Sequence, residues 1–102
     1  MILKLKRLDG DYVNYGYDIF NYFYINTKNI YSIEFYQDED YKGLLINNKR
    51  YPLYDFHQSH RGTEKANNEE EKEEIIEQNW ENGDKYVNNI LNKIIEIMKT
   101  EQ

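Results

Sequence analysis

Apolar and polar side chains alternate in short runs over the first 54 residues, a period of two that predicts β-strands. The first run ends at Asp9-Gly10, a pair that favours the positive φ angles of a tight hairpin. The runs follow one another at hairpin spacing without room for crossover helices, so we expect an antiparallel sheet. Pro52 cannot donate to a ladder, which predicts an edge or a strand end there. The expected strands cover residues 2–8, 12–25 as one bent strand or two short ones, 30–36, 41–46 and 49–54.

From residue 68 onward the apolar spacing changes to that of α-helices. Asn68 precedes three glutamates, a pattern typical of an N-cap with an acidic first turn. Asn82-Gly83 predicts the end of a first helix, with Asp84 as the N-cap of a second one. The second helix carries an apolar stripe that we expect to pack on the sheet: Val87, Ile90, Leu91, Ile94 and Met98.

These patterns predict an α+β fold, an antiparallel β-meander of four to six strands with two C-terminal helices. A chain of 102 residues has the length of one domain. The predicted parts are the sheet in residues 1–56, a polar link in 57–67 and a helical part in 68–100. Further isoleucines beside the stripe widen the apolar surface, which favours self-association through the helices as a homodimer or larger oligomer: Ile75, Ile95 and Ile97.

Composition narrows the function classes. Thirteen Lys and Arg against 19 Asp and Glu give a net charge of −6, which disfavours a general binder of phosphate backbones. The absence of cysteine excludes disulfide scaffolds, thiol nucleophiles and Cys-based metal sites, and it fits a reducing cytosol. Apolar runs are only a few residues long, so neither a membrane span nor a signal peptide is expected. We therefore expect a cytoplasmic protein, in the host cytoplasm if a phage encodes it.

The charge is concentrated in the C-terminal part. Residues 64–84 hold nine acids against Lys65 and Lys72. Such a run is usually a solvated helix face. The functional alternative is that closely spaced carboxylates offer a basic protein partner a surface resembling a nucleic-acid backbone. The candidate partner-binding residues are Glu69, Glu70, Glu71, Glu73, Glu74 and Glu77, joined by Asp38, Glu39 and Asp40 if that loop points the same way.

Tyrosine is abundant in the predicted sheet. Alternation places about half of these side chains on each face, so an exposed aromatic surface is expected. Tyrosine is favoured in protein contacts. Base stacking is the rival role, but the positive potential that it needs is missing, so no direct binding of nucleic acid is expected. The tyrosines of this region are Tyr12, Tyr15, Tyr17, Tyr22, Tyr24, Tyr31, Tyr36, Tyr41, Tyr51 and Tyr54.

Both histidines lie in the polar link. His57 and His60, with Asp55 nearby, could ligate a metal, or one histidine could act as a general base with Arg61 stabilising an oxyanion. A solvated loop is favoured instead, because no packed wall is expected to hold these side chains in place. No glycine-rich phosphate loop, nucleophile elbow or HExxH pattern occurs in the sequence. We therefore expect no enzyme, no metal and no cofactor.

Three parts of the chain carry a family resemblance: the opening MILKLKRLDG, then Ile25, Asn26, Ile30, Ile33 and Glu34, and finally residues 90–98. Together they resemble the small FlbD-like proteins of flagellar operons, and similar meander-plus-helix pieces occur among phage accessory proteins. The resemblance implies a strand-then-helix architecture and assigns no catalytic residue. Residues 12–24 and 57–83 lie outside it, and no flagellar role is carried over because that pattern lacks the acidic segment.

The predicted function is non-catalytic binding of a protein partner. In its sharper form, the chain is a phage or mobile-element inhibitor, anti-CRISPR-like or otherwise anti-defence, that acts on a basic nucleic-acid-handling host protein. Two alternatives stay open. One is a structural subunit that forms homo-oligomers through the apolar stripe, and the other is a small metal-dependent enzyme that uses His57 and His60.

Overall fold

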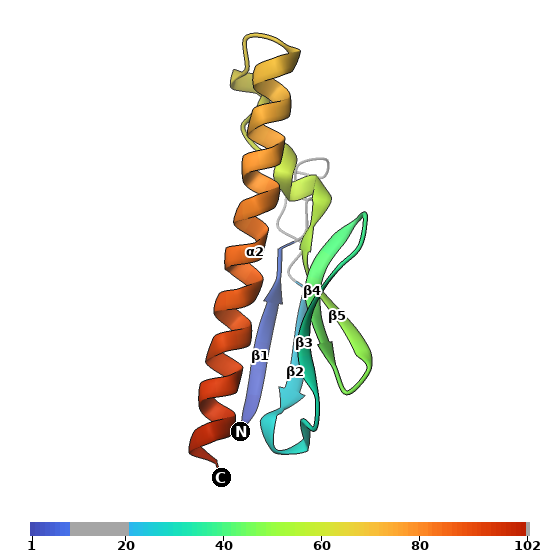
Figure 1. Ribbon diagram of the computed structural model, residues 1–102, viewed down its shortest axis with the longest axis vertical. Helices are drawn as coiled ribbons and strands as arrows, with labels where there is room; N and C mark the ends of the chain where they lie inside the picture. Colours follow the sequence, from blue (N-terminus) through green and yellow to red (C-terminus); the bar gives the residue numbers. More distant parts are fainter. Residues whose placement is uncertain (9–20, 102) are drawn as a thin grey trace.

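The chain folds into short strands followed by one long helix, as the computed structural model of residues 1–8 and 21–101 shows (Figure 1). The strands are β1 (Ile2–Arg7), β2 (Asn21–Asn26), β3 (Ile33–Gln37), β4 (Tyr41–Ile46) and β5 (Lys49–Asp55). The helices are the 3₁₀ turns η1 (Thr27–Asn29), η2 (Phe56–His60) and η3 (Thr63–Lys65), and the α-helix α2 (Glu69–Thr100). The predicted α+β class is confirmed.

The strands form two antiparallel sheets, β1-β2 and β3-β4-β5, where a single meander was expected. The chain leaves the first sheet at η1. The last bond of the β1-β2 ladder is the one from the Thr27 backbone N–H to Met1 O, at 2.9 Å. The two sheets meet at Leu8, which runs parallel to β5. Its N–H donates to Leu53 O at 2.8 Å, and its carbonyl accepts from the Asp55 N–H at 3.1 Å. The antiparallel pairing is therefore confirmed, but the continuous sheet is not.

The turn between β4 and β5 explains how the two sheets are held together. Asn47 and Asn48 have φ angles of 52° and 66°, the left-handed geometry of a tight two-residue hairpin. The Asn47 side chain accepts from the backbone N–H of Tyr31 at 2.8 Å and donates to Asn29 O at 2.9 Å. It therefore fastens the link between the sheets to this turn. As Pro52 predicts, β5 lies at an edge of the three-stranded sheet.

Three sequence-based expectations fall outside the described residues. These are the Asp9-Gly10 turn, the strand over residues 12–17 and the first two residues of the run over 19–25.

One continuous helix of 32 residues replaces the two that were predicted. Its start is as expected, since the Asn68 side chain accepts from the backbone N–H of Glu71 at 2.8 Å. Gly83 does not end a helix. It is buried, and a Cβ atom there would lie only 2.7 Å from Cδ1 of the Tyr54 ring. The glycine therefore allows close packing of α2 on β5, and Asp84 lies inside the helix instead of capping a new one.

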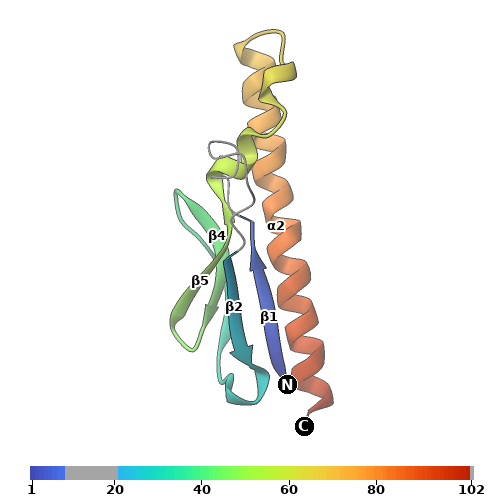
Figure 2. The same cartoon turned by 180° about the vertical axis from the view of Figure 1, so that it is seen from behind.

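The C-terminal half of α2 lies along the strands, whereas its N-terminal part extends beyond them beside η2 and η3 (Figures 1 and 2). The molecule is accordingly elongated, with extents of 52 × 25 × 21 Å. The predicted packing of the apolar stripe is confirmed. Val87 and Ile94 are buried, and Ile90, Leu91 and Met98 pack against the core that they form with the strands. The strands contribute Leu5, Ile25, Leu44, Ile46, Leu53 and Tyr54.

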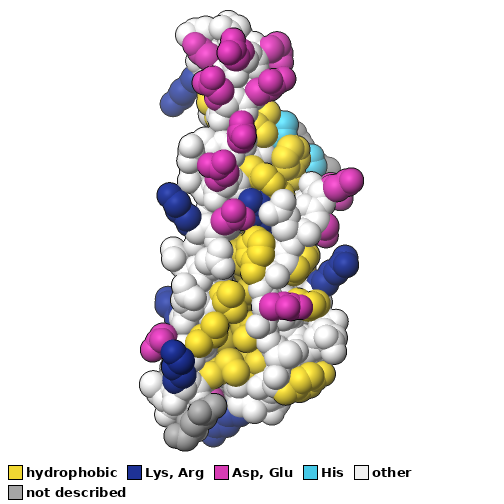
Figure 3. Space-filling model, in the orientation of Figure 1, with side chains coloured by type: hydrophobic (Ala, Val, Ile, Leu, Met, Phe, Trp, Pro, Cys, Tyr) yellow, Lys and Arg dark blue, Asp and Glu magenta, His cyan; other side chains and the backbone are white. Residues whose placement is uncertain are grey.

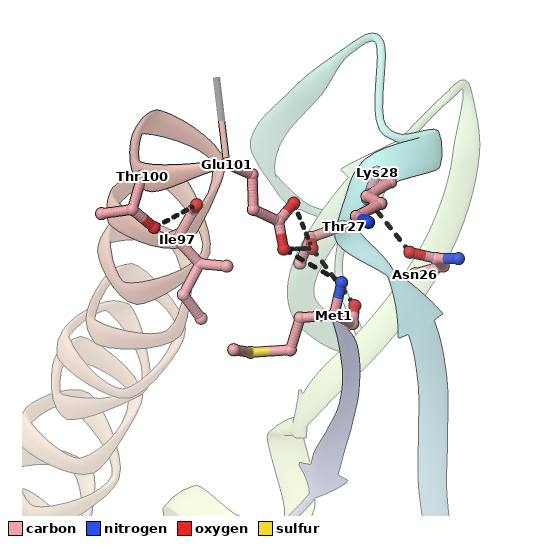
Figure 4. Close-up of polar contacts among 7 residues, drawn as sticks. All are labelled: Met1, Asn26, Thr27, Lys28, Ile97, Thr100 and Glu101. Carbon is pink, nitrogen blue, oxygen red and sulfur yellow. Dashed lines mark hydrogen bonds and ion pairs between the residues drawn. The ribbon is translucent and has the colours of Figure 1, made fainter.

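The two ends of the described chain meet at η1 (Figure 4). The Met1 ammonium donates to Glu101 Oε1 at 2.9 Å, and the Thr27 hydroxyl lies 2.8 Å from both carboxylate oxygens. Two hydrogen bonds lower the pKa of Glu101. The one from the Met1 ammonium has the larger effect, and the one from Thr27 has the next largest. These bonds fasten the last turn of α2 to β1.

A lowered pKa in the folded state means that ionised Glu101 stabilises the fold above the pKa of the unfolded chain. We expect Glu101→Gln to reduce stability at pH 7, with a difference from wild type that shrinks as the pH falls from about 4.5 through the folded-state pKa. Urea unfolding between pH 7 and pH 3 measures this difference, and Glu96→Gln in the exposed part of the same helix end serves as the control. A difference that is independent of pH would contradict the role assigned to this carboxylate.

Candidate functional site

The acidic residues predicted to bind a partner lie on the part of α2 that extends beyond the strands. We call Glu69, Glu70, Glu71, Glu73, Glu74 and Glu77 the acidic end. All are exposed except the partly buried Glu71, which accepts from the backbone N–H of Asn67 at 2.9 Å as part of the N-terminal cap. Figure 3 shows Asp and Glu side chains gathered over this end of the molecule. Within residues 1–8 and 21–101, none of the six takes part in a salt bridge.

Five exposed glutamates share one face of the helix. They follow one another at i, i+3, i+4, i+7 and i+11, so their side chains form a continuous line along α2. We call this line the acidic stripe: Glu70, Glu73, Glu74, Glu77 and Glu81. Like charges at i, i+4 destabilise a helix by about 0.2–0.5 kcal/mol per pair. Repulsion along the stripe opposes the helix, whereas Glu70 in the first turn favours it through the helix dipole. No basic side chain of the described residues forms an ion pair with the stripe.

The link before α2 is packed, contrary to the expectation of a loose polar loop. The Phe56 ring meets the Trp80 ring edge-on, with centroids 5.2 Å apart. The Asn79 amide donates to the carbonyl oxygens of Ser59 at 2.8 Å and Arg61 at 2.9 Å. Ser59 is fully buried. The link therefore packs against α2 at Asn79 and Trp80, just after the acidic end.

A buried lysine fastens the middle of α2 to the sheet. Lys42 on β4 is 2% exposed, and its Nζ donates to Trp80 O and to Asp84 Oδ1, both at 2.6 Å. The same Nζ lies 4.3 Å from the centre of the Trp80 ring. Sequence reasoning did not single out Lys42. The one local signal is its place inside the otherwise apolar run of β4.

Tyr54 provides a second attachment next to the first. Its hydroxyl donates to Asn79 O at 2.9 Å, one residue before the carbonyl that Lys42 binds. Burial raises the pKa of Tyr54, so the hydroxyl keeps its proton and stays a donor. These bonds orient α2 so that its first turns extend past the end of the sheet.

The acidic loop of Asp38, Glu39 and Asp40 joins β3 to β4 and is not part of the acidic end. Asp38 accepts from the backbone N–H groups of Asp40 at 2.9 Å and Tyr41 at 2.7 Å, so its carboxylate shapes the loop between β3 and β4. Asp40 O accepts from the Phe56 N–H at 2.7 Å, which places the loop against η2. Glu39 is exposed. The loop thus lies toward the same half of the molecule as the acidic end without adjoining it (Figure 1).

The histidines are positioned by η2 but do not form a ligand set. Asp55 caps η2 by accepting from the His57 N–H at 3.0 Å, and its Oδ1 lies 3.3 Å from His57 Nδ1. The two imidazole centroids are 6.3 Å apart, and His60 packs edge-on against Phe56. No group of three or more metal-ligating side chains gathers in the described part of the chain. A metal-dependent or general-base activity stays a hypothesis.

The exposed tyrosines of residues 21–101 do not adjoin the acidic end. Tyr22 and Tyr24 are 38% and 66% exposed on β2, with Lys4 over the Tyr22 ring, and Tyr31 is 75% exposed in the link to β3. Others are covered: Tyr54 is buried, and burial raises the pKa of Tyr36 to about 12. Tyr41 and Tyr51 are partly buried, while Tyr12, Tyr15 and Tyr17 lie outside the described residues. Among the described residues, the exposed tyrosines therefore lie on β2 and in the link before β3.

No helix of the described residues combines the length and apolar character that crossing a bilayer requires. The resemblance to FlbD-like proteins stays a prediction, since no protein-family model, curated protein or solved structure matches the chain.

Proposed function

We propose that the protein is a non-catalytic binding module whose acidic stripe occupies a cationic surface of a partner protein. The supporting observation is the arrangement of Glu70, Glu73, Glu74, Glu77 and Glu81 on one exposed face of a helix that extends past the sheets. Repulsion between like charges at i, i+4 opposes the helix, and the basic side chains of a partner would relieve it.

The geometry suits recognition of a groove that also binds nucleic acid. The Cβ atoms of neighbouring glutamates along the stripe are about 5–6 Å apart. This distance is shorter than the screening length of about 8 Å at physiological salt, so the electric fields of their carboxylates add. One side of this half of α2 is covered by η2 and η3. The exposed side that carries the stripe is the one that would contact a cleft shaped for a nucleic-acid strand. The negative field steers encounter, and the partner's Lys and Arg exchange phosphate for carboxylate.

The finer form of the proposal is inhibition of a nucleic-acid-handling host factor by a phage or mobile-element protein, in the manner of an anti-CRISPR-like or other anti-defence inhibitor. The small size and the net charge of −6 support it. Inhibition of this kind requires that the partner cannot hold nucleic acid and this protein at the same time.

Neutralising three carboxylates of the stripe should weaken capture of the partner. Glu70→Gln, Glu73→Gln and Glu74→Gln together leave the cap residues Asn68 and Glu71 intact. We expect immobilised wild type to retain cationic proteins from a nuclease-treated lysate of the native host, and the triple variant to lose at least 10-fold in retention, since each rim charge contributes about 0.5–1 kcal/mol. Mass spectrometry of the retained proteins, at several salt concentrations, measures the effect.

The matched control removes three exposed carboxylates outside the stripe, in Glu34→Gln, Glu64→Gln and Glu96→Gln. It changes the net charge equally and should keep the partner. Equal loss from both variants would show that only net charge matters, and equal retention would show that the stripe plays no part. Either result contradicts the proposal.

The structural alternative stays a prediction, since Ile90, Leu91 and Met98 of the apolar stripe are partly exposed. Val87 and Ile94 are buried against the strands of the same chain. Self-association through them would require α2 to leave the sheets.

A further inference from the structure

The outer edge of β3 is unpaired within residues 1–8 and 21–101. In the three-stranded sheet only β4 is hydrogen-bonded to β3. Ser32 O accepts from the Asn47 N–H just before β3, and the Asp38 N–H donates to Tyr41 O just after it, so the even-numbered residues face β4. Backbone groups of successive strand residues point to opposite sides. The residues that direct their N–H and C=O groups to the open edge are Ile33, Phe35 and Gln37.

The outer sides of two other strands carry features that oppose pairing. β5 contains Pro52, and Leu8 is hydrogen-bonded to its outer side. On β1, Lys4 and Lys6 alternate with leucines, and Lys6 O accepts from the Tyr86 hydroxyl. Proline and lysine are residues with which natural edge strands avoid association. The sequence of β3, IEFYQ, contains neither, so its edge is open to a further strand.

The charges along β3 favour a second copy of the same strand in one register. Antiparallel pairing about a two-fold axis can centre on Glu34, Phe35 or Tyr36, the three central residues. Centring on Glu34 sets two carboxylates opposite each other, and centring on Tyr36 sets Glu34 opposite Asp38 of the second copy. Like charges that are directly opposite destabilise a sheet. Centring on Phe35 sets Glu34 opposite Tyr36, and no like charges then face each other along β3.

The side chains of β3 fit this register on both faces of the sheet. On one face Glu34 is exposed. Burial raises the pKa of Tyr36 to about 12, so its hydroxyl keeps the proton that it would donate to the Glu34 carboxylate of the second copy. On the other face Phe35, which is partly buried against the core, would lie beside its own counterpart. Aromatic pairs across strands stabilise sheets.

We propose that two copies of this chain pair through the outer edges of β3, antiparallel and centred on Phe35, and join their three-stranded sheets into one. Each hydrogen-bonded pair of residues exchanges two backbone bonds. Because α2 runs along the strands (Figure 1), the two helices point in opposite directions and the two acidic ends lie at opposite ends of the dimer. The interface does not use the acidic stripe, so it goes beyond the proposed function and does not depend on it.

The first test follows the ¹⁵N-labelled full chain as its concentration rises. We expect sedimentation equilibrium to show a reversible dimer, and hydrogen exchange at the amides of Ile33, Phe35 and Gln37 to slow as the dimer forms. The amides of Glu34 and Tyr36 face β4, so their exchange should be slow at every concentration. A chain that stays monomeric at millimolar concentration would overturn the proposal, and so would a dimer without this alternation.

A proline on the open edge should weaken the dimer. Gln37→Pro removes an outward N–H and leaves the bonds to β4 in place. The dimer loses one hydrogen bond from each copy, so we expect its dissociation constant to rise by about 10-fold or more. Gln37→Ala keeps the N–H and should dimerise like wild type. Equal dimerisation of the two variants would contradict the proposed pairing.

Disulfide formation reads the register without relying on the proline variant, because the chain contains no cysteine. A mixture of Glu34→Cys and Tyr36→Cys chains places thiols on directly opposed residues, with Cα atoms about 4.5 Å apart. Either variant alone places them on diagonal positions about 7–8 Å apart, too far for an unstrained disulfide. We expect the mixture to form a covalent dimer and each variant alone to form little. Equal yields from all three samples would overturn the proposal.

Discussion

Gly83→Ala should destabilise the protein, although the same change in an exposed helix interior stabilises it by about 1 kcal/mol. The added Cβ would lie 2.7 Å from Cδ1 and 2.9 Å from Cε1 of Tyr54, too close for any ordinary contact. Tyr54 cannot easily move aside, because it is 7% exposed and its hydroxyl is bonded to Asn79 O. Overpacking of this kind costs about 1–3 kcal/mol. After subtraction of the gain of about 1 kcal/mol in helix propensity, we expect a net loss of up to about 2 kcal/mol.

Thermal and urea unfolding measure this change, and a loss of 1 kcal/mol lowers the melting temperature by about 4–8 °C in a chain of this size. The adjacent exposed Asn82→Ala is the control and should change stability by less than about 0.5 kcal/mol. A double-mutant cycle assigns the cause: with Tyr54→Ala present, Gly83→Ala should become stabilising. Stabilisation by Gly83→Ala in the otherwise unchanged protein would mean that α2 does not pack on this ring.

Removing Asp84 should cost more stability than removing Lys42, although the two side chains form one ion pair at 2.6 Å. Asp84→Ala leaves the 2% exposed Lys42 ammonium without its counter-charge, and breaking a buried pair in this way costs about 3–5 kcal/mol. We expect the lower figure of about 2–3 kcal/mol, because the Asp84 side chain is 47% exposed and Trp80 O still accepts from Lys42. Lys42→Met removes the buried charge itself and should cost about 1 kcal/mol or less.

Urea unfolding of the two single variants and the double variant at pH 7 gives the comparison. In Lys42→Met, Asp84 is a partly exposed carboxylate with no buried partner, so its removal should cost little more. The double variant should therefore be about as stable as Lys42→Met. The matched control is Arg50→Met, which removes one partner of the exposed pair with Asp38 at 3.9 Å and should cost less than about 1 kcal/mol. A larger loss from Lys42→Met than from Asp84→Ala would contradict the account of the helix attachment.

The features that sequence predicted are those set by neighbours in the chain. The predicted runs at residues 41–46 and 49–54 correspond to β4 and β5, which ends one residue later at Asp55. The Asn68 cap and the packing of Val87 and Ile94 are also as expected. Each depends on a period or a cap within a few residues, so the local pattern contains the information.

The features that sequence missed depend on contacts between distant segments. Gly83 has the composition of a helix stop, and only the ring of Tyr54 from another element shows that it is a packing site. Lys42 finds its counter-charge 42 residues away, and an unpaired lysine in that run would normally be exposed. The division into two sheets likewise depends on how η1 meets Met1. Local pattern cannot encode these pairings.

The candidate site divides in the same way. Composition was enough to predict the acidic end, because the charge run is local. The acidic stripe and the distance of the tyrosines from it depend on the continuous helix through Gly83, which sequence predicted to break. A second helix starting at Asp84 would have left Glu81 in a turn, and the stripe would have ended at Glu77.

Competition with nucleic acid on the captured partner shows whether the acidic stripe occupies a surface that also binds nucleic acid. The partner retained by wild type is loaded with a fluorescent oligonucleotide, and anisotropy is followed while this protein is added. We expect full displacement at a single stoichiometry, with an apparent affinity that falls as salt rises. The variant with Glu70→Gln, Glu73→Gln and Glu74→Gln should not displace the oligonucleotide. A ternary complex that keeps the oligonucleotide bound would contradict this expectation.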